Sequence, residues 1–487
     1  MKRFFLLFTL FIMALTPLTV SARPTPWQSY IYDSWGYPVP VPDSFVPHAL
    51  VIGHDLGLEA FSNPQDIFYH APTGEVFLVD TGNNRIVIMD TNLRLLGVID
   101  ELNNGGNPDS FSQPQGVFVN ETGIFVADTQ NNRILIVDRS GNVQREFGRP
   151  ETELISANLE WLPRSLVVDN AGRIYVIATG VNLGLVELDV DGNFRNFKGA
   201  NRVSFNIFQY VIRRYFSTDE QRARMQLFVP TEYSNLTIDE HGFIYVTTIT
   251  LGVTGGGVDA VRRLNARGDD ILRRQGYIDV IGDVWSMGEG TSSFVDIAVD
   301  QNGVFSVLDR TRGRIFTYDN DGNLLDVFGG IGFRKGLLQM PTAITYVGDN
   351  IVVVDAFLNN ITVYRPTNYG IALRQATYWY YLGDYEMSAH YWQIVLDHNA
   401  NSDLAFIGLG RIHMRNRNFE QAMEYFRFAG SRTHYSIAFG RHRQEVMQQN
   451  FPVIASVAVG LGVAIWIALK VKDKLSGKEK EEAYDVG

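Results

Sequence analysis

The stretch VFLVDTGNNRIVIMD, residues 76–90, decides the fold because the chain repeats it as IFVADTQNNRILIVD, residues 124–138. Each copy has an apolar run ending in Asp, a polar turn, and a second apolar run that begins with Arg. Two short apolar runs around a polar turn indicate a β-hairpin. Because self-similarity at a fixed period marks a repeat architecture, the copies predict a fold built from one unit used several times.

Six units of this kind can be aligned. Each offers an apolar strand, a Gly turn, a second strand that in most units ends in Asp, a polar turn and a third strand, and some add a fourth strand such as QREFG or LLDVFGG. The units begin at residues 61, 111, 160, 234, 292 and 339. Four strands in each of six units predict a mainly β chain with a six-bladed β-propeller.

The sixth unit has no fourth strand of its own, because the sequence turns helical after ITVYRP. An unassigned segment upstream of the first unit, ALVIGHDLGLEAFSNPQ, resembles DVFGGIGFRKGLLQMPT. We therefore expect residues 49–53 to complete the last blade and to remove two exposed sheet edges.

Three Asp–Arg pairs share one spacing across the turn between the second and third strands. A carboxylate there can cap the turn and pair with the Arg on the next strand. A catalytic pair would not need copying in several blades, so we interpret these residues as structural. The pairs are Asp80 with Arg85, Asp128 with Arg133, and Asp309 with Arg314.

The units resemble NHL repeats, through VDTGNNRIVIMD, ADTQNNRILIVD and LDRTRGRIFTYDNDG, over residues 49–366. That resemblance implies a six-bladed propeller used as a protein-interaction scaffold. Similar rings serve as lactonases and lyases. Proteins that combine an NHL ring with a C-terminal anchor often lie beside carbohydrate-uptake transporters in Gram-positive bacteria, which implies an ABC transporter as a partner.

Two segments are additions to the ring. Residues 201–227 have apolar side chains at helical spacing and predict a helical insertion. Its basic side chains are candidates for contact with a partner or an anionic lipid, or are solvated arginines on a packed helix. Residues 23–48 are rich in aromatics and Pro and predict an extended arm that lies on its own propeller or on another surface. The candidate contact residues are Arg213, Arg214, Arg222 and Arg224.

Beyond the ring, residues 369–447 resemble tetratricopeptide repeats, with YLGDYEMSAHYWQIVL aligned on MRNRNFEQAMEYFRFA. Ser388 stands where the family has its helix-packing Ala, and Gly408 stands where the family tolerates a larger residue. The resemblance implies a short helical stack that binds peptides or helices, or one that braces the stalk.

Both ends of the chain predict export and anchoring. Residues 1–22 read as a secretory signal, cleaved or kept as an anchor. Residues 451–471 are long and apolar enough for a transmembrane helix, and Pro452 suits its first turn. The Lys-rich residues 472–487 favour a cytoplasmic tail, which places the remainder outside the cytoplasm. Small residues every fourth position give the helix a smooth packing face, made of Ser456, Gly460, Ala464 and Ala468.

Composition excludes some classes of function. The net charge is −11, which disfavours nucleic acid as a partner. Cysteine is absent, so neither disulfides nor a lipid-attachment thiol are expected. The sequence contains no Ser-His-Asp order, phosphate loop or helix-borne His pair, and we assign no catalytic residue.

The start of each first strand should face the central channel. The aligned residues there are Asp66, Gly116, Ser165, Asn235, Asp296 and Ala343. Two carboxylates and an amide can hold Ca²⁺, which prefers oxygen ligands, so Asp66, Asn235 and Asp296 form a candidate metal site. We expect Gln65, Arg164 and Ser165 to line the channel.

Two functions follow. One is a membrane-anchored extracytoplasmic binding or scaffold protein that recognises a protein or glycan without catalysis and needs no cofactor. The other is a Ca²⁺-dependent lactonase or hydrolase, similar to gluconolactonases, with its site in the channel. We favour the first, because propeller channels are normally lined by polar side chains and water, and nothing in the sequence fixes the distances between the candidate metal ligands.

Overall fold

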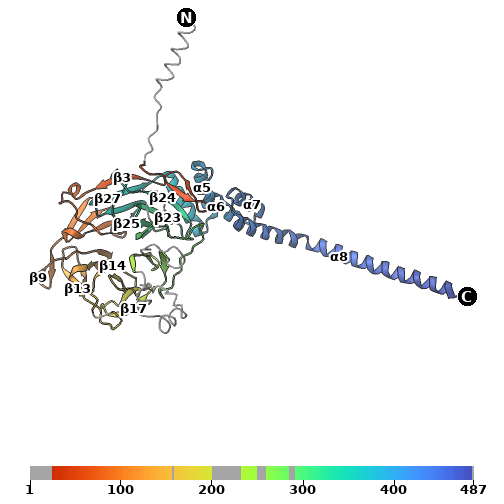
Figure 1. Ribbon diagram of the computed structural model, residues 1–487, viewed down its shortest axis with the longest axis horizontal. Coiled ribbons are helices and arrows are strands. Elements are labelled where there is room, and N and C mark those ends of the chain that lie inside the picture. The colour runs from red at the N-terminus through yellow and green to blue at the C-terminus, as the bar shows by residue number, and fades with distance from the viewer. Residues whose placement is uncertain (1–24, 156–157, 200–231, 249–258, 284–290, 485–487) are drawn as a thin grey trace, which may run out of the picture. The chain divides into compact units, whose positions relative to one another are not determined.

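The computed structural model describes residues 25–155, 158–199, 232–248, 259–283 and 291–484. The chain divides into two compact units, residues 1–384 and 385–487. Figure 1 labels their helices and strands. The predicted signal, residues 1–22, and the predicted helical insertion, residues 201–227, lie outside the described residues, as do Arg213, Arg214, Arg222 and Arg224.

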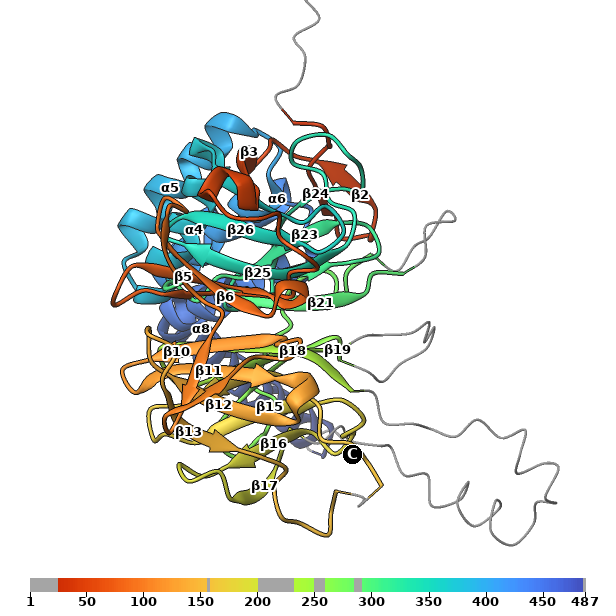
Figure 2. The ribbon, with the colours of Figure 1, turned by 90° about the vertical axis from the view of Figure 1, so that its left-hand side faces the viewer.

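The first unit is a six-bladed β-propeller. The first strands of the six blades contact one another in a closed cycle, β4, β10, β14, β18, β21, β25 and back to β4, which fixes the number of blades. In blade 2 the strands lie in sequence order from β10 to β13 (Figure 2). Blade 4 has three described strands.

The strands of each blade pair antiparallel and have the following bounds. Blade 1 contains β4 (Asp66–His70), β5 (Glu75–Asp80), β6 (Arg85–Asp90) and β7 (Leu95–Ile99), and blade 2 contains β10 (Gly116–Asn120), β11 (Gly123–Asp128), β12 (Arg133–Val137) and β13 (Val143–Phe147). Blade 3 contains β14 (Pro163–Val168), β15 (Ile174–Ala178), β16 (Leu185–Leu188) and β17 (Phe194–Lys198), and blade 4 contains β18 (Tyr233–Ile238), β19 (Ile244–Thr248) and β20 (Val261–Leu264). Blade 5 contains β21 (Phe294–Val299), β22 (Phe305–Asp309), β23 (Arg314–Tyr318) and β24 (Leu324–Gly329), and blade 6 contains β25 (Pro341–Val347), β26 (Asn350–Asp355), β27 (Asn360–Pro366) and β3 (Phe45–Val51).

Apolar side chains of neighbouring blades form the core. The second strands are buried along all or nearly all of their length, as in EVFLVD of blade 1, because neighbouring sheets cover both faces of each sheet. One cluster joins Val76 and Leu78 of blade 1 to Val352 and Val354 of blade 6. Each core cluster of the ring thus spans at least two neighbouring blades.

The N-terminal strand β3 closes the ring. It pairs antiparallel with β27, in the register Val51 to Ile361 and Ala49 to Val363. The strand begins at Phe45, so residues 45–48, which the sequence analysis gave to the arm, also belong to blade 6. Gly53 already starts the short 3-10 helix η1 (Gly53–Leu56), which ends the predicted closing segment early.

The arm lies on its own propeller. Strands β1 (Tyr30–Tyr32) and β2 (Pro38–Pro40) form a hairpin that extends blade 5 beyond β24. The hydroxyl groups of Tyr30 and Tyr32 both donate to the carboxylate of Asp283, the first at 2.7 Å. Burial raises the pKa of Asp283, whereas the hydrogen bonds from the two tyrosines lower it. The net effect is a lowered pKa of Asp283.

Helix α4 (Asn368–Leu382) follows β27 directly and belongs to the first unit. Thr367 caps it by accepting a hydrogen bond from the Gly370 amide at 3.1 Å, and Arg374 donates to Asp349 at 2.7 Å. A Cβ on Gly370 would lie 2.1 Å from the carbonyl oxygen of Ser44, so this turn packs tightly on the segment before β3. The helical stack predicted from residue 369 is therefore split, because α4 is fixed to blade 6.

The second unit is helical. Its helices are α5 (Tyr385–His398), α6 (Asp403–Arg415), α7 (Phe419–Phe428) and α8 (Arg432–Tyr484). Ser388 and Ala422, which the predicted repeat aligns, are both fully buried. Gly408 leaves room for Trp392, since a Cβ there would come within 2.4 Å of the indole. The tetratricopeptide resemblance remains a prediction.

Helix α8 runs unbroken from the helical unit through the apolar segment. Pro452 lies inside it rather than in a first turn, which a helix can accommodate at the loss of one backbone hydrogen bond. The most apolar 18 residues of this helix have a mean hydropathy of 2.3, and none of them is buried. Among the described residues, this is the one helix long and apolar enough to cross a membrane.

Ring closure can be tested at Phe45. Its side chain is 1 % exposed and stacks on Phe328 at 5.0 Å between ring centroids. We expect Phe45→Ala to lower the free energy of unfolding by about 3–5 kcal/mol, because it leaves a cavity where β3 meets blade 5. Urea unfolding followed by tryptophan fluorescence measures the change.

Leu50→Ala is the matched control, because Leu50 lies on the same strand but is 41 % exposed. Leu50→Ala should lower the free energy of unfolding by less than about 1 kcal/mol, because the Leu50 side chain is less buried than that of Phe45. Equal losses in the two variants would contradict the closing role of the Phe45 contact.

Candidate functional site

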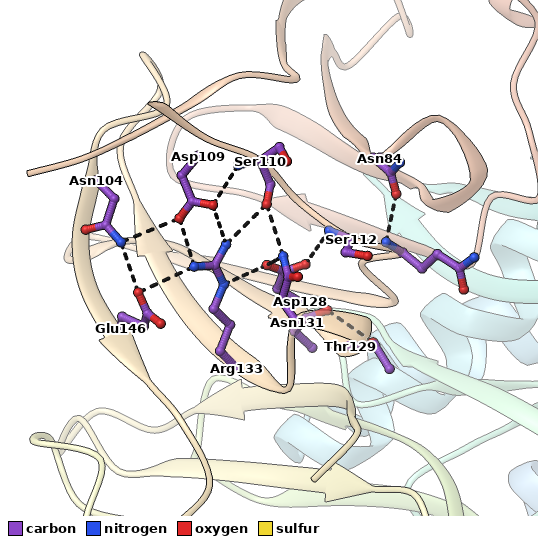
Figure 3. Close-up of polar contacts among 12 residues, drawn as sticks. Asn84, Asn104, Asp109, Ser110, Ser112, Asp128, Thr129, Asn131, Arg133 and Glu146 are labelled. Atoms are coloured by element: carbon purple, nitrogen blue, oxygen red, sulfur yellow. Dashed lines mark hydrogen bonds and ion pairs between the residues drawn. The ribbon is translucent and has the colours of Figure 1, made fainter. Parts of the chain in front are cut away.

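The repeated DTGNNR and DTQNNR segments each build one hydrogen-bonded clamp. In blade 2 Asp128 accepts from Arg133 Nε at 2.8 Å, from Asn131 Nδ2 at 2.8 Å and from the Ser112 amide at 2.7 Å (Figure 3). In blade 1 Asp80 accepts from Arg85 Nε at 2.8 Å. The clamp ties the strand-to-strand turn to the chain entering the same blade, so it sets where the first strand begins.

Sequence reasoning missed part of this network. In blade 2 Arg133 also forms a two-pronged ion pair with Asp109, at 2.8 and 3.0 Å, and lies 3.4 Å from Glu146 (Figure 3). Asp109 ends the extra hairpin of β8 (Leu102–Asn104) and β9 (Asn107–Asp109), whose position no repeat predicts. Blade 5 differs from the predicted pairing, because Arg314 contacts Asp283, while Asp309 accepts from the Ser293 amide at 2.8 Å.

Another residue of the same segment links neighbouring blades. Asn84 has a left-handed backbone, φ 52°, and its side-chain oxygen accepts from the Gln113 amide of blade 2 at 2.7 Å. Asn359 of blade 6, φ 52°, accepts in the same way from the Asn63 amide of blade 1 at 2.8 Å. Asn tolerates this backbone region better than most residues, which explains its place in the segment.

The six aligned channel positions form a belt, and the four polar side chains in it make hydrogen bonds. Asp66 accepts from the Val117 amide of blade 2 at 2.9 Å, and Asp296 accepts from the Ile344 amide of blade 6 at 2.6 Å. Between them Ser165 donates to Asn235, which donates to Asp296 at 2.6 Å. These side chains therefore hold successive blades together.

At the belt position of Gly116, blade 2 lies close against the backbone of blade 3. A Cβ there would lie 2.5 Å from the carbonyl oxygen of Arg164 and 2.9 Å from the Cα of Ser165. A side chain at this position would push blades 2 and 3 apart. The close packing of the two blades therefore explains why the belt has a glycine here and no polar group.

A pocket lies at the channel, next to this belt. Its empty volume is about 430 Å³, including the solvent at its mouth. Each blade contributes the residue just before its belt position, and Ser165, Asn235 and Arg310 complete the wall. The six are Gln65, Gln115, Arg164, Ser234, Val295 and Thr342.

β-Bulges direct four of these side chains. The pairing of first and second strands skips one residue in blades 3 to 6: Arg164, Ser234, Val295 and Thr342. A bulge places an extra residue in one strand and redirects its side chain. Consecutive residues such as Arg164 and Ser165 can therefore both face the pocket, although side chains in a regular strand alternate.

Most polar groups of the wall already have partners. Ser234 donates to the Phe294 carbonyl at 2.8 Å, and Thr342 donates to the Pro64 carbonyl at 3.0 Å. Gln65 donates to Asn63 at 2.8 Å. The guanidinium of Arg164 has no ion-pair partner within the described parts of the chain, and burial lowers the pKa of Arg164.

The predicted Ca²⁺ ligands lie in the belt, but their arrangement does not suit a cation. Asp66 and Asp296 accept backbone amides, at 2.9 Å from Ile67 and 2.8 Å from Ile297 as well as across the blades. Burial raises the pKa of Asp66 to about 7, and burial together with the neighbouring Asp66 raises the pKa of Asp296 well above its ordinary value, which favours neutral carboxyls. No group of three His, Cys, Asp or Glu that could hold a metal occurs among the described residues.

Comparisons with known proteins add little on function. No family model matches the chain, and no curated protein matches it. A catalytically inactive virginiamycin B lyase from Staphylococcus aureus has 14% identity and a TM-score of 0.39, covering 65% of this chain and 84% of the lyase. A protein proposed to be a gluconolactonase has 13% identity and a TM-score of 0.39, covering 67% and 94%. The U3-55K protein has 11% identity and a TM-score of 0.41, covering 66% and 100%. Scores this low carry no argument about activity.

The clamp can be tested in blade 2. We expect Asp128→Asn to lower the free energy of unfolding by about 2–3 kcal/mol, because it removes a buried charge that Arg133 and a backbone amide both need. Asp191→Asn is the control, since Asp191 is 66% exposed and only 3.4 Å from an exposed Arg145. It should cost less than about 1 kcal/mol. Urea unfolding that shows the same loss for both would contradict the clamp.

Asp66 should make stability depend on pH. Its pKa is about 7 when folded and near 4 in the unfolded chain, so between these values the folded protein keeps a proton that the unfolded chain loses. Stability due to this group is therefore greatest below about pH 4 and falls by up to about 1.4 kcal/mol per unit until about pH 7. We expect Asp66→Asn to make the decline between pH 5 and 7 shallower.

Urea unfolding at pH 5, 6, 7 and 8 measures the effect. Asp191→Asn, at an exposed site, should follow the wild-type curve. Parallel curves for Asp66→Asn and wild type would show that Asp66 stays ionised in the folded protein.

Proposed function

We propose that the chain is a membrane-anchored extracytoplasmic binding or scaffold protein with its C-terminus in the cytoplasm. The observation that carries this proposal is the apolar segment of α8, whose most apolar stretch has no buried residue among those that the structure describes. Its exposed side chains include Phe451, Leu461 and Ile465, at 65%, 60% and 60%. Such a surface is stable in lipid and not in water.

The small residues of α8 support a second contact inside the membrane. Ser456, Gly460, Ala464 and Ala468 recur every fourth residue along the helix. The Ser456 hydroxyl donates to the Pro452 carbonyl at 2.7 Å, so it leaves no unsatisfied donor in lipid. We propose that this face packs on a spanning helix of the partner.

The propeller is the recognition platform in this proposal. Several large aromatic side chains of the first unit are exposed among the described residues, including Trp35, Tyr37 and Phe333 at 78%, 69% and 77%. Exposed aromatics are typical anchors in protein and glycan recognition. The NHL resemblance suggests that the partner is a carbohydrate-uptake ABC transporter, and Arg213, Arg214, Arg222 and Arg224 remain candidate contacts.

The alternative proposal is a Ca²⁺-dependent lactonase or hydrolase. It has weaker support, because the candidate ligands already accept backbone amides and two arginines line the adjoining pocket. Calcium titration with melting temperature as readout tests it, since a ligand of the folded state must raise that temperature. A rise that Asp66→Asn and Asp296→Asn abolish would favour the hydrolase.

Crosslinking in membranes tests the scaffold proposal. A photoreactive amino acid in place of Trp35 should trap a membrane-spanning transporter subunit, because this exposed side chain lies where a partner can reach it. The same amino acid at Asn92, an exposed polar turn of blade 1, is the control and should give no such product. Recovery of uncrosslinked chain from both positions, or release of the protein from membranes at alkaline pH, would contradict the proposal.

A further inference from the structure

The pocket of the propeller channel contains an excess of hydrogen-bond donors. Two of its wall residues are arginines, Arg164 on blade 3 and Arg310 on blade 5. They come from different blades but line the same pocket, and burial, followed by the positive charge of Arg164, lowers the pKa of Arg310. Like charges held together in a partly buried wall are unfavourable unless an anion lies between them.

Arg310 differs from the residues at the matching position of blades 1 and 2, and it adds positive charge to the channel. It follows the clamp Asp of blade 5, where blades 1 and 2 have Thr81 and Thr129. Each Thr hydroxyl donates to a carbonyl of the next blade at 2.7 Å, and Arg310 Nε reaches the corresponding Pro341 carbonyl at 3.4 Å. The link between blades needs only a Thr, so the rest of the guanidinium is available for another role.

The negative groups near the pocket do not neutralise these arginines. Asp66 and Asp296 are held by backbone amides of two blades each. Neither Arg164 nor Arg310 is among the groups that shift the pKa of either carboxyl. Glu232, the acid that acts on Arg164, accepts the Gly180 amide at 3.1 Å. Neither arginine has an ion-pair partner among the described residues, and the charge of Glu232 acts on Arg164 alone, so the wall keeps a net positive charge.

We propose that this pocket binds a small organic anion through a carboxylate or phosphate group held between Arg164 and Arg310. The planar fork of a guanidinium matches two oxygens on one centre, which favours these groups over a halide. Gln115 lies beside the arginines and can donate its amide to the anion, while Val295 gives one apolar surface for the ligand body. This site goes beyond the membrane partner proposed above and does not depend on it.

Calorimetry on the full-length chain in a neutral detergent tests the proposal. The probes are sodium D-glucuronate for a carboxylate, inorganic phosphate for a phosphate, and D-glucose as the uncharged counterpart of glucuronate. We expect binding of at least one anion at low ionic strength, weaker binding as NaCl is raised, and no binding of glucose. The stronger of the two anions identifies the group that the site prefers.

Variants locate the binding. Arg164→Gln and Arg310→Gln should each weaken it about tenfold to a hundredfold, since each removes a charged hydrogen bond. Arg267→Gln is the matched control, because Arg267 is 84% exposed and lies outside the pocket, and it should bind as wild type. Gln115→Glu keeps the side-chain shape, breaks no hydrogen bond seen among the described residues, and should abolish binding by repulsion.

The result that would overturn the proposal is no heat with either anion, or equal binding by wild type, Gln115→Glu and Arg164→Gln. Circular dichroism of each variant separates loss of binding from loss of fold. The crosslinking result with Trp35 is unaffected by either outcome, so the two proposals fail independently.

Discussion

The pairing of β3 with β27 is the constraint on which the rest of the structure depends. A propeller made of open blades would leave sheet edges and a gap in its core, and the ring removes both by joining its two ends. The closed cycle of first strands follows, and with it the channel, the belt and the pocket. The arm and α4 then pack around the closing strand, so Phe45 contacts both Phe328 and the Arg374 guanidinium.

The sequence revealed the parts of the fold that repeat. The DTGNNR segments predicted the hairpins, six units predicted six blades, and the incomplete sixth unit predicted the source of its fourth strand. Each of these signals is local or is a comparison of the chain with itself. The edge addition of β1 and β2 to blade 5 has no repeated counterpart, and periodicity could not place it.

The candidate site was predictable only in outline. Gln65, Arg164 and Ser165 were expected at the channel, and the structure brings them together with Asn235 in one wall. The β-bulges are the part that could not be foreseen, because a skipped residue is a property of strand pairing and not of one strand. Arg310 could have been found by aligning the residue after each clamp Asp, where one Arg replaces Thr.

Charge is distributed unequally between the two layers of the channel. In the belt the carboxylates bind backbone amides and join blades, so their role is cohesion. In the wall the arginines lie beside amide and apolar side chains. The acidic residues that the sequence suggested as metal ligands thus join neighbouring blades of the ring. The arginines of the pocket wall are the charged groups that can bind a ligand.

The order of strands along the chain also has a consequence for biosynthesis. The strand that completes blade 6 is made before any blade, and its partner β27 is made after every other strand of the ring. A chain emerging from the ribosome or a translocation pore must keep β3 unpaired until residue 366 is available, and contacts so distant in sequence form slowly. Assembly of the ring can therefore end only after its last strand, β27, has been made.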